Sequence, residues 1–393
     1  MTAFSPPAMP RDFVTHADLQ GRRVWQILPA ALSAVPALQG LSFPGASTGE
    51  HDSWDFPQAQ RVCVALIDGM GWHMLNERLA YAPFLRQELR NQVRDLNAYT
   101  CVPSTTASAI TSITVGRGPG QTNMLGYQVR DPKTAEVFSL ISFEDAPCEP
   151  EIFQPHPTLF ETLVAAGFTS DVLGPKKFIG RGLTRTSLRG ARYVTSETLD
   201  ARIACALDAS YKGTTLTYFY WAELDHVGHS RGWKSEEWAH ELEVLSSGLE
   251  QLAKGLAPGT LLIVTADHGM VDTDPSTRFD LASKPEIAQS VEAVAGEPRA
   301  LQIFTRAGHG SQVKSLLKQW LGDLALVLDR NETALLIGEV ARPEILGDVC
   351  VFMSGNAVLV DSRFHSAKAM ELPGVHGSLT EAEMCVPALS ILV

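Results

Sequence analysis

The sequence predicts an α/β fold built around a mainly parallel β-sheet. Short apolar runs of strand length alternate with longer amphipathic segments, and several of the runs open into polar residues at their carboxyl ends. This alternation favours a parallel sheet, because parallel neighbours need a crossover connection that usually contains a helix. The chain has 393 residues, of which 45% are hydrophobic, so it is long enough to bury a large core.

Four segments have the pattern of a strand that ends in a polar loop. The first, RVCVALIDGMG (61–71), precedes WHMLNERLAYAPFLRQELRNQ (72–92), whose apolar spacing predicts an amphipathic helix. The other three strand candidates are GFTSDVLGPKK, TLTYFYWAELDH and TLLIVTADHGM. Helices that cover the sheet are predicted for HPTLFETLVAAG (156–167) and SEEWAHELEVLSSGLEQLAKGL (235–256).

The chain divides into three parts by the character of its segments. Residues 1–50 are predicted to be an N-terminal extension and lead-in, and residues 51–280 together with 350–393 are predicted to form the core. Residues 281–349 show short helix and strand signals without acidic strand ends, which indicates an inserted cap subdomain.

Composition excludes some classes of partner. A net charge of −12 and a pI near 5.4 argue against binding of nucleic-acid polymers, which requires basic surfaces. The first 23 residues lack the apolar run of a signal peptide, and no apolar span approaches the ~20 residues that cross a bilayer. We therefore expect a cytoplasmic protein without membrane association. The six scattered cysteines are expected to be reduced thiols.

Carboxylate and imidazole side chains follow the predicted strands. Asp68 closes the first strand, Asp267 and His268 close the strand at 260–265, and Asp225 and His229 have the spacing of one helical face. In open α/β sheets ligands bind beyond these strand ends, and mixed Asp and His ligands suit zinc. Each residue alone has an ordinary explanation as a turn, a cap or a solvated side chain. With His376 from a glycine-flanked loop, however, they supply three ligands for each of two metals, and His226 competes with His229 for one role.

A hydroxyl-rich segment, CVPSTTASAITSITVG (101–116), offers a nucleophile at the predicted start of a helix. Ser104, Thr105 or Thr106 would ordinarily cap that helix. A bound metal lowers the pKa of a coordinated hydroxyl, and a helix N-terminus favours phosphate oxygens, so capping and nucleophilic catalysis are compatible here.

The ordered motifs DGMG, PSTTA, DHVGH, ADHG and VHG resemble those of the alkaline phosphatase superfamily, and more narrowly those of the type I phosphodiesterase / nucleotide pyrophosphatase family. The resemblance runs from Arg61 to the C-terminus outside the predicted insertion. It implies an alkaline-phosphatase-like three-layer sandwich with a small inserted cap. It also implies metal-dependent hydrolysis of phosphodiester or pyrophosphate bonds through a phospho-threonine intermediate.

Carried over onto matching positions, the family pattern makes Thr106 the nucleophile, with Thr105 as the fallback. Two divalent metal ions are implied, with zinc as the preferred ion. One zinc would be held by Asp68, Thr106, Asp267 and His268. The other would be held by Asp225, His229 and His376.

The sequence departs from the family where an asparagine in a segment resembling HGIIDN helps to hold the phosphoryl oxygen. Here the segment is QTNMLGYQ, so Tyr127 takes that position and Asn123 is a nearby amide; both are candidate substrate contacts. Lys176 and Lys177 are expected to be solvated rather than to bind substrate. CVPST also resembles the sulfatase signature, but Thr105 stands where that signature requires arginine.

The partner implied is a small phosphate ester, with a nucleotide as one option. Phosphonate hydrolysis or phosphomonoester hydrolysis within the same superfamily stays open as an alternative. A non-catalytic binding protein is a third hypothesis, which the intact ligand set disfavours.

Overall fold

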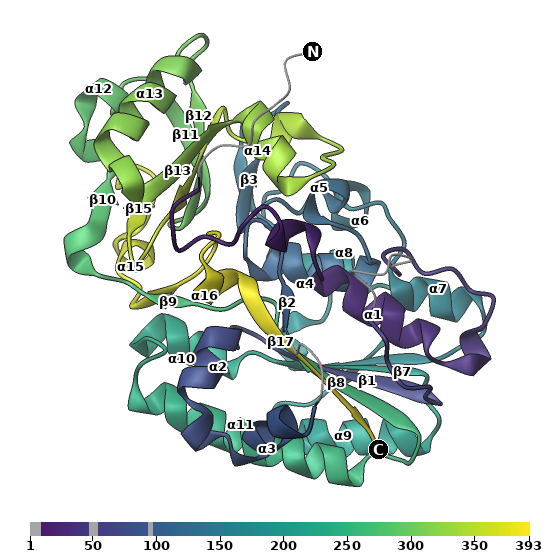
Figure 1. Ribbon diagram of the computed structural model, residues 1–393. Helices are drawn as coiled ribbons and strands as arrows, with labels where there is room; N and C mark the ends of the chain where they lie inside the picture. The colour runs from purple at the N-terminus through teal and green to yellow at the C-terminus, as the bar shows by residue number, and fades with distance from the viewer. Residues whose placement is uncertain (1–8, 47–53, 93–96) are drawn as a thin grey trace.

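The computed structural model describes residues 9–46, 54–92 and 97–393. Its centre is a seven-stranded sheet in the order β2-β17-β8-β1-β7-β5-β6 (Figure 1). These strands are β1 (Arg61–Ile67), β2 (Asn97–Tyr99), β5 (Ser170–Gly174), β6 (Arg192–Thr195), β7 (Leu216–Trp221), β8 (Thr260–Thr265) and β17 (Cys385–Leu392). Strands β8, β1, β7, β5 and β6 run parallel, whereas β17 is antiparallel to β8 and β2. The predicted mainly parallel α/β sheet is confirmed.

The three adjacent central strands explain why the polar strand ends meet. Strands β1 and β8 are continuous apolar runs that are buried almost throughout, as expected for parallel strands covered on both faces. Leu66 of β1 pairs with Tyr220 on one side and with Thr265 on the other. The three strands therefore end at the same level, and the residues that follow them share one edge of the sheet.

Helices cover both faces of the sheet, which gives the three layers of the predicted sandwich (Figure 1). The face drawn below the sheet carries α2 (Trp72–Glu77), α3 (Pro83–Asn91), α9 (Leu199–Tyr211), α10 (Glu223–Arg231) and α11 (Glu236–Gly255). The face drawn above it carries α1 (Val24–Ser33), α4 (Thr106–Val115) and α7 (Leu159–Ala165). Helix α11 buries a leucine stripe at helical spacing, and Ser235 caps it by accepting a hydrogen bond from the Trp238 N–H.

Two predicted segments differ in the structure. The single helix expected at 72–92 is divided into α2 and α3 at Pro83, because proline restricts the residue before it and suits the first turn of a new helix. The predicted lead-in contributes to the core, since Val24, Ile27 and Leu28 of α1 are buried in the main apolar cluster. Residues 1–8 and 47–50 of that lead-in lie outside the described residues.

A second, smaller sheet forms the inserted unit, defined here as residues 278–360. The strand order of this sheet is β11-β12-β14-β13, and all pairings within the sheet are antiparallel. Its elements include β10 (Arg278–Asp280), β11 (Val291–Glu297), β12 (Ala300–Thr305), α13 (Gly310–Leu321), β13 (Ala325–Asp329), α14 (Arg330–Ile337), β14 (Val349–Met353) and β15 (Val358–Val360). Strand β15 pairs with β10, so the unit extends past the predicted boundary at 349. The apolar run of β14 resembles a core strand in sequence, but β14 pairs with β12 and β13 of this second sheet.

Shorter elements connect these layers. They are α5 (Pro119–Thr122), β3 (Gln128–Arg130), β4 (Val137–Ser139), α6 (Pro150–Phe153), α8 (Gly182–Ser187), β9 (Val271–Asp272), α12 (Pro285–Ala288), α15 (Ala367–Met370), β16 (Gly374–Val375) and α16 (Glu381–Met384).

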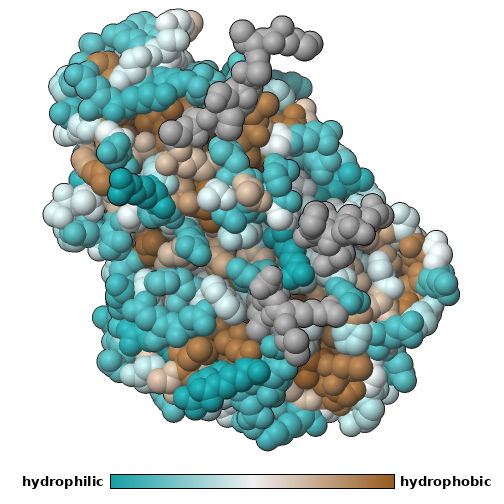
Figure 2. Space-filling view, viewed as in Figure 1, coloured by the Kyte–Doolittle hydropathy of each residue, from teal (hydrophilic) through white to brown (hydrophobic). Residues whose placement is uncertain are grey.

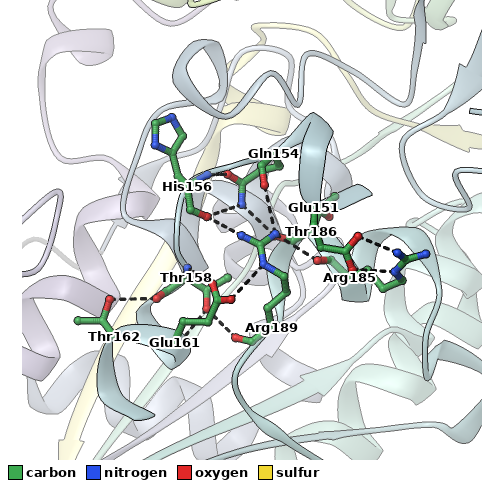
Figure 3. Close-up of polar contacts among 9 residues, drawn as sticks. All are labelled: Glu151, Gln154, His156, Thr158, Glu161, Thr162, Arg185, Thr186 and Arg189. Carbon is green, nitrogen blue, oxygen red and sulfur yellow. Dashed lines mark hydrogen bonds and ion pairs between the residues drawn. The ribbon is translucent and has the colours of Figure 1, made fainter. Parts of the chain in front are cut away.

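Two arginines, Arg185 in α8 and Arg189 just after it, hold this part of the chain against α6 and against the segment between α6 and α7 (Figure 3). Arg189 donates to the backbone carbonyls of Gln154 and His156, at 3.2 and 2.7 Å. Arg185 pairs with Glu151 at 2.7 Å. Because backbone carbonyls accept these charged donors, the position of α8 is set by main-chain contacts as well as by packing.

One face of the molecule is mainly polar. In Figure 2 hydrophilic residues cover most of the visible face, and hydrophobic residues appear between them in separate patches. Among the described residues, no helix is both long and apolar enough to cross a bilayer.

Candidate metal centre

The structure brings the seven predicted site residues together at the carboxyl edge of the central sheet. Six of them form two groups. Within each group the ligand atoms lie within 4.8 Å of one another. The first group, here called group A, is Asp68, Asp267 and His268. The second, group B, is Asp225, His229 and His376. Group A follows β1 and β8, whereas group B comes from α10, which follows β7, and from the loop after β16.

Each carboxylate keeps one buried oxygen without a hydrogen-bond partner among the described residues. Asp267 accepts the backbone N–H of Gly69 at 3.1 Å and that of His268 at 3.0 Å on Oδ1, which leaves Oδ2 unpaired. Asp68 accepts the Tyr220 hydroxyl on Oδ2, which leaves Oδ1 unpaired. Oδ1 of Asp225 is also unpaired. Buried polar atoms without partners are uncommon, and carboxylate oxygens in this state suit a cation.

Gly69 permits the end of β1 to lie close to Asp225 of α10. Its φ is +72°, and a Cβ on it would lie 3.0 Å from Cβ of Asp225. A larger residue would therefore be strained and would press on a carboxylate of group B.

Each imidazole is held by a backbone carbonyl that fixes its tautomer. Nδ1 of His229 faces the Gly374 carbonyl at 2.8 Å, Nδ1 of His268 faces Gly269 at 3.0 Å, and Nδ1 of His376 faces Ser104 at 2.9 Å. A ring nitrogen beside a carbonyl oxygen must donate, so the lone pair of each ring lies on Nε2. Each Nε2 lies near group carboxylates, for example 3.5 Å from Asp225 Oδ1 for His229 and 3.4 Å from Asp68 Oδ1 for His268.

Burial makes this concentration of like charge costly. Burial, followed by the neighbouring Asp267 and Asp225 carboxylates, raises the pKa of Asp68 well above its usual range. Burial also raises the pKa of Asp267. Burial, followed by His268 and His229, lowers the pKa of His376 well below its usual range. A divalent cation in each group would favour ionised carboxylates and neutral imidazoles, so the donor set fits two metal ions.

Thr106 is the first residue of α4 and lies next to group A. Its Oγ1 is 3.1 Å from Nε2 of His268, and the side chain is partly buried. None of the three predicted hydroxyls caps the helix: Thr105 occupies the N-cap position without a side-chain cap hydrogen bond. Ser104 instead donates its hydroxyl to the carbonyl of Ser378 at 2.7 Å. Thr106 is therefore the hydroxyl of this segment that is adjacent to the group A ligands.

A cavity of about 820 Å³ opens over the two groups. Its apolar and aromatic lining includes Ile110, Ile141, Leu173, Phe178, Leu183, Leu188, Tyr193 and Tyr218. Tyr127 also lines the cavity and is 45% exposed. Asn123 is not among the lining residues, because its amide is turned toward the Phe153 carbonyl, to which it donates at 2.9 Å.

Two further predicted candidates lie where the sequence alone could not place them. Lys177 is exposed, as expected, but it also lines the cavity, and its Nζ lies 5.0 Å from the centroid of the Phe178 ring. His226 also lines the cavity, but it is outside both ligand groups; its Nδ1 lies 3.4 Å from Glu223.

Sequence reasoning missed two side chains of this region. Tyr220 supports Asp68 from within the apolar run TLTYFYW, where a hydroxyl at the end of a buried strand was an available signal. Glu297 lines the cavity from the inserted unit, in which no acidic strand end was expected. The Gly-Glu-Pro-Arg turn that carries it gives no local sign that it faces a site on another sheet.

Comparisons with known proteins agree with this geometry. Residues 62–315, more than half of the chain, match the family model described as type I phosphodiesterase / nucleotide pyrophosphatase. Among curated relatives, phosphopentomutase of Anaeromyxobacter dehalogenans is 36% identical over 159 residues, which are 39% of this chain and 38% of that protein. Phosphopentomutase of Sinorhizobium fredii is 32% identical over 130 residues, which are 32% and 30% of the two chains. The chain thus spans less than two fifths of the length of these two relatives.

Similar folds occur among solved structures. Murine ectonucleotide pyrophosphatase / phosphodiesterase 5 superposes with a TM-score of 0.67 at 17% identity, over 84% of this chain and 88% of that one. Phosphonoacetate hydrolase of Sinorhizobium meliloti, in complex with phosphonoformate, superposes with a TM-score of 0.68 at 19% identity, over 85% and 91%. At these identities the likeness establishes the alkaline-phosphatase-like fold.

Proposed function

The chain belongs to the type I phosphodiesterase / nucleotide pyrophosphatase family, and from this premise we propose that it hydrolyses phosphodiester or pyrophosphate bonds at a dinuclear metal centre. The observation that carries the proposal is the pair of ligand groups beside Thr106. Three unpaired carboxylate oxygens and three Nε2 lone pairs face one another there, and a hydroxyl nucleophile lies at a helix N-terminus.

Group A together with Thr106 would hold one ion, and group B would hold the other. Zinc is the preferred ion because mixed carboxylate and imidazole ligands suit it. Two such ions supply Lewis-acid charge that neutralises phosphoryl oxygens and lowers the pKa of a coordinated hydroxyl.

The side chains of the chain then have distinct roles. Thr106 Oγ1, deprotonated, attacks phosphorus, and the backbone N–H groups at the start of α4 bind phosphoryl oxygens. The new bond joins Oγ1 to phosphorus while the bond to the leaving oxygen breaks, which gives phospho-threonine. The proton that Thr106 lost goes to the leaving oxygen. Water then attacks the same phosphorus, the bond from phosphorus to Oγ1 breaks, and one proton of that water returns to Oγ1. Tyr220 and the carbonyls of Gly269, Gly374 and Ser104 hold the ligands in place throughout.

The cavity supports a substrate with a sizeable organic group. Its volume and aromatic walls accept an apolar or planar substituent, and Lys177 adds positive charge. Structures similar to this one include an inactive variant of murine ectonucleotide pyrophosphatase / phosphodiesterase 5 in complex with AMP, and phosphonoacetate hydrolase in complex with phosphonoformate or phosphonoacetate. A small phosphate ester, with a nucleotide as one option, is therefore the proposed substrate class.

Two other activities have observations in their favour. The phosphonoacetate hydrolase likeness favours phosphonate hydrolysis, and the curated relatives favour a phosphomutase. Hydrolysis of phosphomonoesters is a third outcome of the same metal chemistry.

A substrate panel on zinc-loaded protein tests the proposal. It contains bis(4-nitrophenyl) phosphate, 4-nitrophenyl phosphate, a dinucleotide pyrophosphate, phosphonoacetate and a pentose phosphate. We expect the highest kcat/KM for a diester or a pyrophosphate. A far higher value for the monoester or phosphonoacetate, or isomerisation of the pentose phosphate without phosphate release, would replace the phosphodiesterase proposal by the corresponding alternative.

A further inference from the structure

The turn that joins β11 to β12 reaches from the inserted unit into the cavity. Gly296, Glu297 and Pro298 of this turn line the cavity together with Asp68 of group A and the three residues of group B. Gly296 has a φ of +80°, and a Cβ there would lie 2.2 Å from the Ala300 carbonyl oxygen, so the tight turn requires glycine. The inserted unit thus contributes side chains to the candidate centre.

Arg299 anchors this turn to the main core. It is fully buried, and its Nε and Nη2 donate to the two carboxylate oxygens of Glu383 at 3.1 and 2.7 Å. Glu383 also accepts the N–H of Ser378 and the hydroxyl of Thr380, at 3.0 and 2.6 Å. The turn and the loop that follows His376 are therefore held in one charged hydrogen-bond network.

Glu297, by contrast, has no ion-pair partner among the described residues. Its side chain is 6% exposed, and neither carboxyl oxygen makes a hydrogen bond with a described residue. The Thr105 hydroxyl and the Tyr127 N–H lie near enough to moderate the effect of burial and of Glu383, which together raise the pKa of Glu297 to about 8. Burying such a carboxyl group destabilises the folded state unless a ligand forms hydrogen bonds with it.

The surroundings of Glu297 identify that ligand. Thr105 is the N-cap residue of α4, so the acid lies at the N-terminus of a ten-residue helix, where backbone N–H groups attract phosphate oxygens. On its other side is Gly377, directly after His376: a Cβ on Gly377 would lie 2.6 Å from Cγ of Glu297. The unpaired carboxyl is thus flanked by the segments that carry Thr106 and His376.

We propose that Glu297 is a substrate-contacting residue, which donates a hydrogen bond from its carboxyl group to a phosphoryl oxygen and selects singly charged phosphodiesters over doubly charged phosphomonoesters. The inference rests on the proposed phosphoryl chemistry and deepens it. A carboxylic acid can donate only while it keeps its proton, because a carboxylate and a phosphoryl oxygen repel each other. A second negative charge on the phosphoryl group increases that repulsion, and the acid offers no countercharge, unlike an arginine or a lysine.

The test compares Glu297→Gln and Glu297→Leu in the full zinc-loaded chain. Glutamine donates without ionising, whereas leucine cannot donate. We expect Glu297→Gln to keep kcat/KM for both substrates within about threefold at about pH 6, where both side chains are neutral donors. At about pH 9 the wild-type carboxylate is ionised and repels the doubly charged monoester, so Glu297→Gln should there gain about tenfold over the wild type on 4-nitrophenyl phosphate, and selectivity for the diester should fall. Glu297→Leu should lose about 10- to 100-fold on the diester, as expected for a lost hydrogen bond to a charged group. Glu292→Gln, an exposed acid on the same strand, is the matched control and should equal the wild type.

Equal losses for both variants on both substrates would indicate a structural role and overturn the inference, as would wild-type activity in Glu297→Leu. Calorimetric titration with inorganic phosphate separates this inference from the proposed function. If the wild type turns over none of the substrates, the proposed function fails. Weaker phosphate binding in Glu297→Leu with retained binding in Glu297→Gln would still support the contact, and unchanged binding in both variants would overturn it.

Discussion

The imidazole rings of His268 and His376 are stacked, with centroids 3.6 Å apart and 16° between the planes. His268 follows β8 and belongs to group A, whereas His376 lies in the loop after β16 and belongs to group B. The two ligand groups are therefore in contact through these two stacked rings. Burial, followed by the neighbouring His268 and His229, lowers the pKa of His376, and the backbone carbonyl at Nδ1 of each stacked ring leaves Nε2 as the nitrogen suited to bind a metal.

Loss of one group B ligand should remove one of two metal ions. We predict that Asp225→Asn lowers the zinc content from about two to about one per chain, because group A retains its own three ligands. Inductively coupled plasma mass spectrometry of dialysed protein measures this. His240→Ala, which changes an exposed imidazole on α11, should keep both ions. An unchanged zinc content in Asp225→Asn would show that group B does not hold a metal.

Thr106 should be required for turnover but not for metal retention. Thr106→Ala is expected to lower kcat by about 10³-fold or more while zinc stays bound, since six other side chains provide ligands. Thr106→Ser should recover part of the activity because it restores a hydroxyl. Retained activity in Thr106→Ala, together with a loss in Thr105→Val, would assign the nucleophile to Thr105.

Removing one partner of the Arg299–Glu383 pair should lower the free energy of unfolding more than replacing both partners by apolar residues. Arg299→Met leaves Glu383 buried without its countercharge, and we expect a loss of about 3–5 kcal/mol in the free energy of unfolding. The double variant with Glu383→Leu should recover part of this loss. Urea unfolding measures both. Lys212→Met removes one partner of the exposed Lys212–Asp208 pair and should cost less than about 1 kcal/mol; equal losses at the two sites would contradict the role of the buried pair.

The free energy of unfolding should fall with rising pH because the pKa of Glu297 is raised in the folded state. The unfolded glutamate releases its proton near its ordinary pKa of 4.5, whereas the folded one keeps it up to about pH 8. Between these values the unfolded chain binds fewer protons, so the contribution of Glu297 declines with pH, with a limiting slope of about 1.4 kcal/mol per pH unit. Glu297→Gln should therefore gain more stability over the metal-free wild type at pH 8 than at pH 5. Equal differences at both pH values in thermal unfolding would refute this assignment.

The parts of the molecule that the sequence predicts are those with a strong local pattern. The apolar runs of β1 and β8 predict the parallel sheet, and polar strand ends predict where Asp68 and Asp267 lie. The i, i+4 spacing of Asp225 and His229 likewise predicts one helical face, and both lie on α10. Local rules suffice here because period and strand termination depend on neighbouring residues.

The remainder depends on contacts between distant segments. Glu297 reaches the cavity only because Arg299 pairs with Glu383, 84 residues away in the sequence. The inserted unit ends later than expected because β15 pairs with β10, although nothing in β15 itself specifies that partner. The orientation of the Asn123 amide toward Phe153 and the position of Lys177 at the cavity likewise depend on tertiary packing.

Anomalous X-ray diffraction at the zinc edge tests the dinuclear centre most directly. Crystals of zinc-supplemented protein should show two anomalous peaks, one enclosed by Asp68, Asp267 and His268, and the other enclosed by Asp225, His229 and His376. A folded, zinc-supplemented chain without a peak at either group, or with zinc only elsewhere, would contradict the account.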